Sequence, residues 1–384
     1  MQKSTEDNLR WHHIQTKATH NSYRPGPVGG GAVAAWRYWH ENLTTQLETQ
    51  GVRALELDVH WSSTTGDYPV YHVHPLPPLV SDNRSHDDCT SIRSCLQVIR
   101  AWSEERPAHQ PLFLFVEPKT MPAEEDDWDT FFDGIDIAIR DRLAGQIVLP
   151  RDVLGEYKSG GAVAAAGAWP TIEATRGKVV AVLLARGSWR DAYAARSVDQ
   201  RSMLMLGKGD RETLKEMQGF GIVSYERPQD HQDDIRALIA QGRLIRAHVD
   251  YQVQERYDNN PCVLEAAKAM GVHFLTTDFP WPTRRPLPNG FDCDPGAWVG
   301  GETPCQKEPA FLQERTDLES ICRYHWVSIP GALASRCNPV TAADIACQDA
   351  SIENPMHVYN FERHFNPCVE MGFEGPQCSE SLLR

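Results

Sequence analysis

The sequence lacks several features that define whole classes of protein. No run of about 18 apolar residues occurs among its 384 residues, so we expect no transmembrane segment. Basic residues are in deficit, since 38 Lys and Arg stand against 52 Asp and Glu, and the net charge of -14 excludes a general nucleic-acid-binding surface. An apolar share of 41% excludes disorder, collagen and coiled coil as the main architecture.

Closely spaced CxxC pairs are also absent, although the chain has ten cysteines. Zinc sites favour such pairs, so we predict disulfides instead, with Cys89–Cys95 as the most local one. The other cysteines all lie beyond residue 261. Because structural disulfides form in oxidising compartments, we expect a secreted or extracytoplasmic protein. The N-terminus MQKSTEDN is polar and unlike a signal peptide, so we expect an exported protein to have this chain as its mature form.

Short apolar runs recur up to residue 280 and predict strands. Helical patterns lie between them, and the clearest cover residues 131–143 and 263–270. Strands that alternate with helices about eight times predict an α/β fold, a TIM-like (β/α)8 barrel. The runs outnumber the strand positions by one, so we expect those at 203–206 and 221–224 to compete. The runs cover residues 12–20, 54–60, 69–74, 112–117, 179–184, 203–206, 221–224, 244–249 and 273–277.

A change of composition at residues 284–290, RRPLPNG, marks a predicted domain boundary. We expect the barrel to occupy residues 1–288 and a disulfide-rich C-terminal extension to occupy residues 289–384. The extension is rich in Cys, Pro and Gly and shows little periodicity. Such a composition is typical of a loop-rich segment that is held together by disulfides.

Polar residues gather where the predicted strands end. The first strand leads into HNSY at 20–23, and the second carries ELD at 56–58, where Glu56 and Asp58 share a face. The third is predicted to end in YHVH at 71–74 and the fourth in EPK at 117–119. Because the carboxyl ends of barrel strands meet at one mouth, we expect these side chains to converge there.

The expected cluster has the chemistry of a site for a hard cation. Glu56, Asp58 and Glu117 would repel one another at close range unless a cation bound them. With the amide of Asn21 they form an all-oxygen set, which suits Ca²⁺ or Mg²⁺, whereas the histidines by themselves would suggest zinc or iron. With four oxygen ligands we predict Ca²⁺ over zinc or iron. A divalent cation beside two histidines suits attack on a phosphodiester, because the cation polarises phosphoryl oxygens and the imidazoles donate protons.

Four motifs, HNSY at 20–23, ELDVH at 56–60, VYHVH at 70–74 and VEPK at 116–119, together resemble the calcium-dependent phosphoinositide-specific phospholipase C family. The resemblance covers residue 12 to about residue 280. It implies a phosphodiesterase with Ca²⁺ as cofactor, which releases diacylglycerol and a cyclic inositol phosphate from a phosphatidylinositol-like phospholipid at a membrane surface. We expect a monomer without a nucleic-acid partner.

The resemblance also implies roles for individual residues. His20 matches the histidine that stabilises the pentavalent phosphorane, and His72 matches the one that protonates the leaving group. Either Glu56 or Glu117 would assist the attacking inositol hydroxyl. The positions that match the family's calcium ligands are Asn21, Glu56, Asp58 and Glu117.

Substrate binding is assigned to Lys119, His74 and Arg186. Lys119 fits two interpretations equally well, since it could hold the phosphate or pair with Glu117. His74 stays an alternative to His72 as the second catalytic histidine. For Arg186, His248 and Asp278, which follow later strands, packing of the barrel is favoured over catalysis.

Two other functions stay open. A glycerophosphodiester phosphodiesterase, or an enzyme similar to sphingomyelinase D, would share the barrel and the scheme of metal and carboxylates. The glycerophosphodiester enzymes would carry Asp-Gly after the second strand, whereas this chain has Gly66-Asp67, which favours the phospholipase. A non-catalytic binding protein would need to have lost a ligand, yet every motif position is present.

Overall fold

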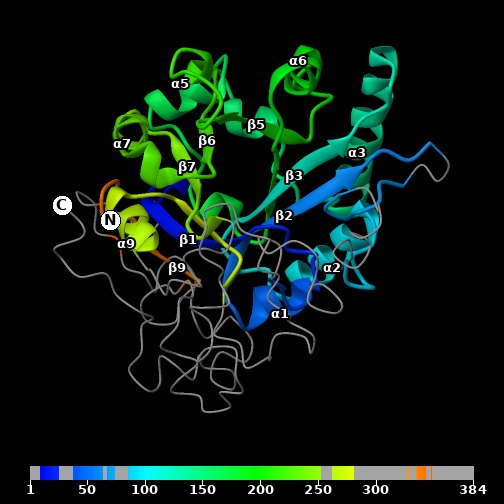
Figure 1. The fold of residues 1–384 in the computed structure, drawn as a ribbon, viewed down its shortest axis with the longest axis horizontal. Coiled ribbons are helices and arrows are strands. Elements are labelled where there is room, and N and C mark those ends of the chain that lie inside the picture. Colours follow the sequence, from blue (N-terminus) through cyan, green and yellow to red (C-terminus); the bar gives the residue numbers. More distant parts are fainter. Residues whose placement is uncertain are drawn as a thin grey trace, which may run out of the picture.

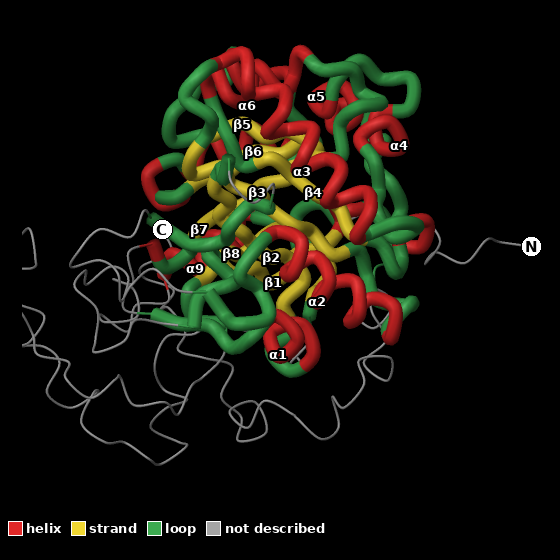
Figure 2. The backbone as a smooth tube through the Cα atoms, turned by 90° about the vertical axis from the view of Figure 1, so that its right-hand side faces the viewer, coloured by secondary structure: helices red, strands yellow, loops and turns green. Residues whose placement is uncertain are grey.

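Eight parallel strands form a closed barrel, and helices surround it (Figure 1, Figure 2). The structure is a computed structural model, which describes residues 9–25, 38–63, 67–73, 85–251, 262–280, 327, 334–342 and 347. Each strand pairs with the next, and β1 pairs with both β8 and β2, which closes the barrel. The barrel strands are β1 Ile14–Thr19, β2 Val52–His60, β3 Leu112–Thr120, β4 Val179–Leu183, β5 Met203–Lys208, β6 Ile222–Tyr225, β7 Leu244–His248 and β8 Phe274–Thr277.

The predicted TIM-like barrel is confirmed, but one predicted strand is wrong. The runs at 203–206 and 221–224 do not compete, because they form β5 and β6. The surplus run is 69–74, whose described residues make only two isolated antiparallel bridges, Val59–Val70 and Pro69–Ser91. A parallel neighbour of β2 needs a crossover of about a dozen residues or more, and the segment follows β2 too closely for that.

The helices predicted at 131–143 and 263–270 are confirmed as α3 Trp128–Arg142 and α9 Cys262–Met270. Gly145 lies just after α3 with φ 78, a left-handed conformation that suits glycine at the end of a helix. The other described α-helices are α1 Leu43–Glu48, α2 Ile92–Glu105, α4 Pro150–Leu154, α5 Gly160–Ala165, α6 Gly187–Ala195 and α7 Gln232–Ala240. Short 3₁₀ turns are η2 Trp11–His13, η6 Glu125–Asp127, η7 Glu173–Thr175, η8 Glu216–Gly219 and η9 Pro228–Asp230.

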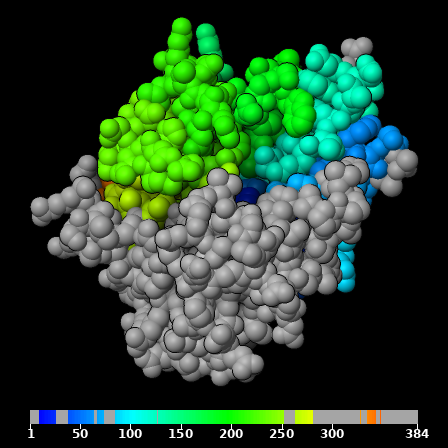
Figure 3. Space-filling view, in the orientation of Figure 1, coloured from blue at the N-terminus to red at the C-terminus, as the bar shows by residue number. Residues whose placement is uncertain are grey.

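Alternation along the strands divides the core into an outer and an inner part. Leu55 and Leu57 of β2 belong to the cluster that packs under α2 and α3. Ala54 of the same strand belongs to the cluster inside the barrel, together with Phe113 of β3. Trp11, just before β1, packs on Phe113 with ring centroids 5.2 Å apart and so closes the amino end of the barrel. On the face drawn in Figure 3, the described helices lie across the upper part of the view, from α7 at the left through α6 to α3 at the right.

Part of the predicted extension joins the barrel sheet. Strand β9 Ser335–Cys337 pairs antiparallel with Ile14–Thr16, the first half of β1. Two disulfides are described, Cys89–Cys95 at the start of α2 and Cys337–Cys347 beside β9. The predicted boundary between residues 288 and 289 lies outside the described residues. Within the described ranges, no helix is both long enough and apolar enough for a membrane span.

Candidate active site

The predicted site residues meet where the inward faces of neighbouring strands reach the carboxyl end of the barrel. Glu56 and Asp58 follow Ala54 on the inward face of β2. On β3, Glu117 and Lys119 likewise continue the face of Phe115, and the register sets Asp58 beside Glu117. The same alternation that buries Ala54 and Phe115 therefore turns the carboxylates towards the barrel axis.

Three carboxylates form the centre of this site. One oxygen atom from each of Glu56, Asp58 and Glu117 lies within 4.8 Å of the others. Glu56 and Asp58 are fully buried, whereas the side chain of Glu117 is 24% exposed. Lys119 Nζ lies 2.9 Å from Glu117 and 3.2 Å from Asp58, and the Arg246 guanidinium contacts Glu56. Two cations thus contact the three carboxylates directly.

The three carboxylates are not equivalent. Burial raises the pKa of Asp58 well above its ordinary value, and the nearby Glu117 and Glu56 add to this rise against the opposing charge of Lys119. Burial also acts to raise the pKa of Glu117, but Lys119 and Lys208 outweigh it and lower that pKa to about 2. Asp58 is therefore the carboxylate that would gain most from a further positive charge.

Asn21 places its side-chain amide next to Asp58. Its backbone has φ 48, a left-handed conformation that asparagine adopts more readily than most residues. In the orientation that satisfies both amide atoms, the side-chain nitrogen donates to the two carboxylate oxygens of Asp58 at 3.0 and 3.2 Å, and the side-chain oxygen accepts from the Tyr38 hydroxyl at 2.8 Å. A cation bound beside Asp58 would turn the amide so that its oxygen faces the carboxylates. The donor set of one amide and three carboxylates fits Ca²⁺.

His20 connects the carboxylate cluster to a second buried network. Its Nδ1 lies 2.8 Å from Asp278 Oδ1, and its Nε2 lies 3.8 Å from Glu56 Oε1. Because an ionised carboxylate only accepts, Nδ1 carries the proton in this pair and Nε2 is the nitrogen that faces the cluster. The Tyr38 hydroxyl lies 3.2 Å from Nδ1, and His40 Nε2 donates to the His20 carbonyl at 2.7 Å. Several contacts therefore hold the ring in one orientation.

Asp278 is itself held by a buried histidine. His248 Nε2 lies 3.2 Å from Asp250 Oδ1 and 3.5 Å from Asp278 Oδ2. Burial acts to lower the pKa of His248, but the carboxylates of Asp278 and Asp250 outweigh it and raise that pKa to about 10. Burial acts to raise the pKa of Asp278, yet His20 and His248 hold it below its ordinary value. His248 is thus an imidazolium at neutral pH, and Asp278 is ionised.

His72 lies next to this site, in the bend after the Val59–Val70 bridge rather than on a barrel strand. The preceding Tyr71 donates its backbone N–H to the Asp58 carbonyl at 3.3 Å and stacks on His60 with ring centroids 3.6 Å apart. Burial, followed by the charges of Lys119 and His20, lowers the pKa of His72 to about 3. The ring therefore lies within electrostatic reach of both, and it is neutral at neutral pH.

The three residues assigned to substrate binding differ in position. Lys119 lies among the carboxylates and forms an ion pair with Glu117 and another with Asp58. Arg186 is exposed at the N-terminus of α6 and forms no ion pair with any described residue of the cluster. His74 lies outside the described residues.

Sequence reasoning missed Arg246 and undervalued Asp278. Arg246 alternates with Leu244 and His248 on β7, so the inward face of this strand carried a signal that could have identified it. Asp278 directly follows β8, at the same edge as the other site residues. The sequence favours a packing role for Asp278 and His248. In the structure, Asp278 contacts His20 Nδ1 at 2.8 Å, and the ring centroids of His248 and His20 lie 4.6 Å apart.

Comparisons with known proteins agree with this geometry. A family model described as "Phosphoinositide phospholipase C, Ca2+-dependent" matches residues 79–293, which is more than half of the chain. The match contains Glu117, Lys119 and Asp278 and begins after Asp58. A search of curated proteins gave no match.

Solved structures of bacterial enzymes share the fold. The calcium-dependent phosphatidylinositol-specific phospholipase C of Streptomyces antibioticus is 17% identical with a TM-score of 0.52, and the alignment covers 71% of this chain and 95% of that one. The calcium-dependent enzyme of a Pseudomonas species, described as a myo-inositol complex, is 17% identical with a TM-score of 0.53 over 72% and 93% of the two chains.

The barrel with its cluster of carboxylates and histidines is that of a phospholipase C-like phosphodiesterase. The chain belongs to the calcium-dependent phosphoinositide phospholipase C family, as the resemblance of its motifs predicted.

Proposed function

We propose that this protein is a calcium-dependent, phosphatidylinositol-specific phospholipase C that acts on phospholipid at a membrane surface. One observation carries the proposal. His20 Nε2 lies 3.8 Å from Glu56 Oε1, and His20 Nδ1 lies 2.8 Å from Asp278 Oδ1. A histidine fixed in this way beside a carboxylate cluster suits a phosphodiester that loses an alkoxide. Membership in the family supports the inositol lipid as substrate.

The cation would be held by the oxygen donors of the cluster. When bound, Ca²⁺ polarises phosphoryl oxygens and lowers the pKa of a nearby hydroxyl. Lys119, which contacts both Glu117 and Asp58, would shift towards the phosphate when the cation takes over these carboxylates. We keep His74 and Arg186 as further contacts of the substrate. The proposed calcium ligands are Asn21, Glu56, Asp58 and Glu117.

Each proton transfer and each bond change in the proposed reaction is assigned to named groups. The inositol 2-hydroxyl loses its proton to Glu56 or Glu117, and its oxygen bonds to phosphorus. His20 donates Nε2–H to a phosphoryl oxygen as negative charge grows there, and Asp278 stabilises the imidazolium through Nδ1. The bond from phosphorus to the diacylglycerol oxygen breaks, and that oxygen takes a proton from His72. The products are diacylglycerol and a cyclic inositol phosphate, which water then opens.

His72 needs its proton before it can serve as an acid. Its pKa of about 3 means that the ring is neutral at neutral pH before substrate binds. The negative phosphate would favour the protonated ring by the same electrostatic effect through which Lys119 now disfavours it. We therefore propose that His72 takes up its proton together with the substrate.

Phosphorus NMR on phosphatidylinositol, with calcium and with EGTA, tests the proposed function. We expect the cyclic phosphate as the earliest product, formed only with calcium. A phosphodiesterase that uses water as the first nucleophile cannot make the cyclic phosphate. Inositol 1-phosphate as the sole earliest product, or release of a phosphorylated lipid in place of diacylglycerol, would contradict the proposal.

Histidine variants test the assigned roles. His20→Ala and His72→Ala should each lower kcat about 10²–10⁴-fold with calcium binding retained. A substrate with a better leaving group should partly rescue His72→Ala but not His20→Ala, because only His72 is assigned proton donation to that group. His74→Ala should have a much smaller effect, and His13→Ala, at the amino end of the barrel, is the control. A larger loss in His74→Ala than in His72→Ala would reverse the assignment.

We also propose that the protein is secreted or extracytoplasmic, with the barrel ending near residue 288 and a disulfide-rich extension after it. The described disulfides Cys89–Cys95 and Cys337–Cys347 support the oxidising compartment. Mass spectrometry of the protein from its native source should find no free thiols among the ten cysteines. A full set of free thiols would refute the location.

A further inference from the structure

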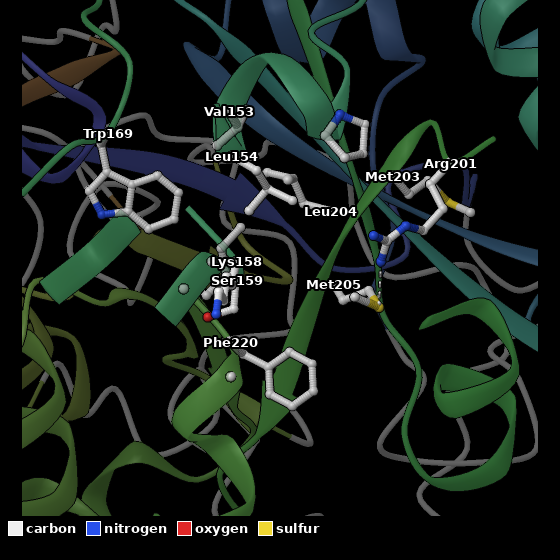
Figure 4. A pocket seen from close by; sticks show the side chains of 15 residues that line it. Val153, Leu154, Lys158, Ser159, Trp169, Arg201, Met203, Leu204, Met205 and Phe220 are labelled. Atoms are coloured by element: carbon white, nitrogen blue, oxygen red, sulfur yellow. Dashed lines mark hydrogen bonds between the residues drawn. The ribbon is translucent and has the colours of Figure 1, made fainter. Parts of the chain in front are cut away.

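A hollow opens at the amino ends of β5 and β6, at the opposite end of the barrel from the carboxylate cluster (Figure 4). Met203 and Leu204 at the start of β5 line it, with Ile222 at the start of β6 and Leu154 of α4. The empty space measures about 550 Å³, open mouth included.

Two glycines and a tryptophan shape one wall of the hollow. A Cβ on Gly221 would lie 2.5 Å from the Trp169 ring and 2.6 Å from the Gly160 carbonyl oxygen, so glycine is required for this approach of α5 to β6. Trp169 donates its indole N–H to the Gly242 carbonyl at 2.8 Å. Its polar atom is therefore satisfied elsewhere, and the ring is left as an apolar surface towards the hollow (Figure 4).

Arg201 is a half-buried cation in the wall of the hollow, and Asp136 and Tyr193 stabilise its charge only from a distance. Its Nη1 donates to the Met205 sulfur at 3.7 Å, a weak acceptor (Figure 4), and its Nε is buried without a hydrogen-bond partner. Burial lowers the pKa of Arg201, which reflects the cost of a poorly solvated cation. No described carboxylate forms an ion pair with it. Nearby arginines do have such partners, since Arg151 contacts Asp199 and Arg196 contacts Asp133.

The lining of the hollow is basic in an acidic protein. Lys158 is the second cation in its wall, is exposed and forms no ion pair with the described residues. No Asp or Glu lines the hollow, although the chain has a net charge of -14. An apolar wall with one half-buried guanidinium and a second cation suits a molecule with an apolar body and an anionic end.

We propose that this hollow binds a single-chain carboxylate, such as the anion of a medium-chain fatty acid, with its head on Arg201 and its chain along Met203, Leu204 and Leu154. A guanidinium pairs in a bidentate way with a planar carboxylate, and the Nη groups of Arg201 would make this pair. The methionines suit a flexible chain, since their unbranched side chains adapt to its shape. The site is separate from the catalytic mouth and does not depend on the proposed function.

Calorimetric titration of the full chain with decanoate, at concentrations below those that form micelles, tests the proposal. We expect one site per chain. Arg201→Gln should weaken decanoate binding about tenfold or more through loss of the charged contact. Leu154→Trp should abolish binding because the larger ring fills the path of the chain. Arg236→Gln, which removes an exposed arginine on α7, is the matched control and should bind like the unaltered protein.

A neutral ligand and a short ligand test the two parts of the site separately, namely the cation that would bind the carboxylate and the apolar wall that would bind the chain. Decanol should bind at least tenfold more weakly than decanoate because it lacks the charged head, and acetate should not bind measurably because it lacks the chain. Absence of decanoate binding, equal binding by decanol, or unchanged binding in Arg201→Gln would each overturn the proposal. These measurements use no turnover, so failure of the phospholipase assignment would leave them unaffected.

Discussion

The two ends of the barrel interior use the same strand alternation for opposite purposes. At the amino end the inward positions are apolar, as with Ala54 on β2, Phe113 on β3 and Phe274 on β8. Two residues or more further along the same face, the inward positions carry charge, as with Glu56 and Glu117. The alternation of side chains along the strands therefore places both the apolar core and the charged site. The residue type at each inward position decides whether that end of the barrel is core or site.

The energetics of the two ends differ accordingly. At the amino end, Phe113 and Phe274 pack edge to face with ring centroids 4.6 Å apart, a contact that stabilises the fold directly. At the carboxyl end, Glu56, Asp58, Asp278 and His248 are buried ionisable groups, whose desolvation is offset only by their neighbours. The amino end therefore adds to the stability of the fold, whereas the buried charges at the mouth cost stability and serve function. Substitutions at the two ends should have different consequences.

Removal of calcium should have the largest effect, and it should affect only the mouth. With EGTA we expect turnover to fall to background, because the carboxylates cannot all remain ionised and orient substrate without the cation. Glu56→Gln should weaken calcium affinity sharply, as measured by titration calorimetry. Full activity in EGTA would show that Lys119 and Arg246 alone suffice to balance the cluster.

Asp278→Asn should lower kcat about 10²-fold or more while it leaves calcium affinity nearly unchanged. The neutral amide no longer stabilises a positive charge on the His20 ring, so the ring loses the charge that supports its protonated form. Steady-state kinetics beside a calcium titration measure this separation. Asp233→Asn, an exposed carboxylate on α7, is the control. An equal loss of calcium affinity would assign Asp278 to the metal instead.

Phe113→Ala should show the reverse pattern at the amino end. Removal of this buried ring leaves a cavity next to Trp11 and Phe274, and we expect the free energy of unfolding to fall by about 3–5 kcal/mol. The kcat of the folded fraction should stay within about threefold of the unaltered enzyme, since no site residue moves. Chemical denaturation and activity assays on the same samples test this. A kcat loss as large as that of Asp278→Asn would mean that the two ends are coupled.

The smallest effect is a dependence of stability on pH that arises from His248. Its pKa is raised from 6.5 to about 10 in the folded protein, so its contribution is complete below pH 6.5 and is lost as the pH rises towards 10. We expect the free energy of unfolding to fall by about 1 kcal/mol from pH 7 to pH 8 on this account. His248→Gln should remove that slope in urea titrations. An unchanged slope would place the titration elsewhere.

The sequence by itself determined the barrel and most of the proposed calcium ligands, because both follow from local periodicity. Strand alternation put Glu56 and Asp58 on one face, and the barrel rule then brought Glu117 and Asn21 to the same mouth. The same local periodicity misleads at residues 69–74, where an apolar run predicts a strand although its connection to β2 is too short for a parallel crossover.

Only the tertiary structure decided which distant charges meet. His20 and Asp278 are 258 positions apart, and Glu56 and Arg246 are 190 apart. No periodicity relates such residues, since their contact depends on how eight strands close into a barrel and on the register between them. Arg201 shows the same limit, because only the folded chain reveals that no described carboxylate forms an ion pair with it. Alternation along a strand fixes which face a side chain takes, and burial and pairing across the closed barrel fix what that side chain can do.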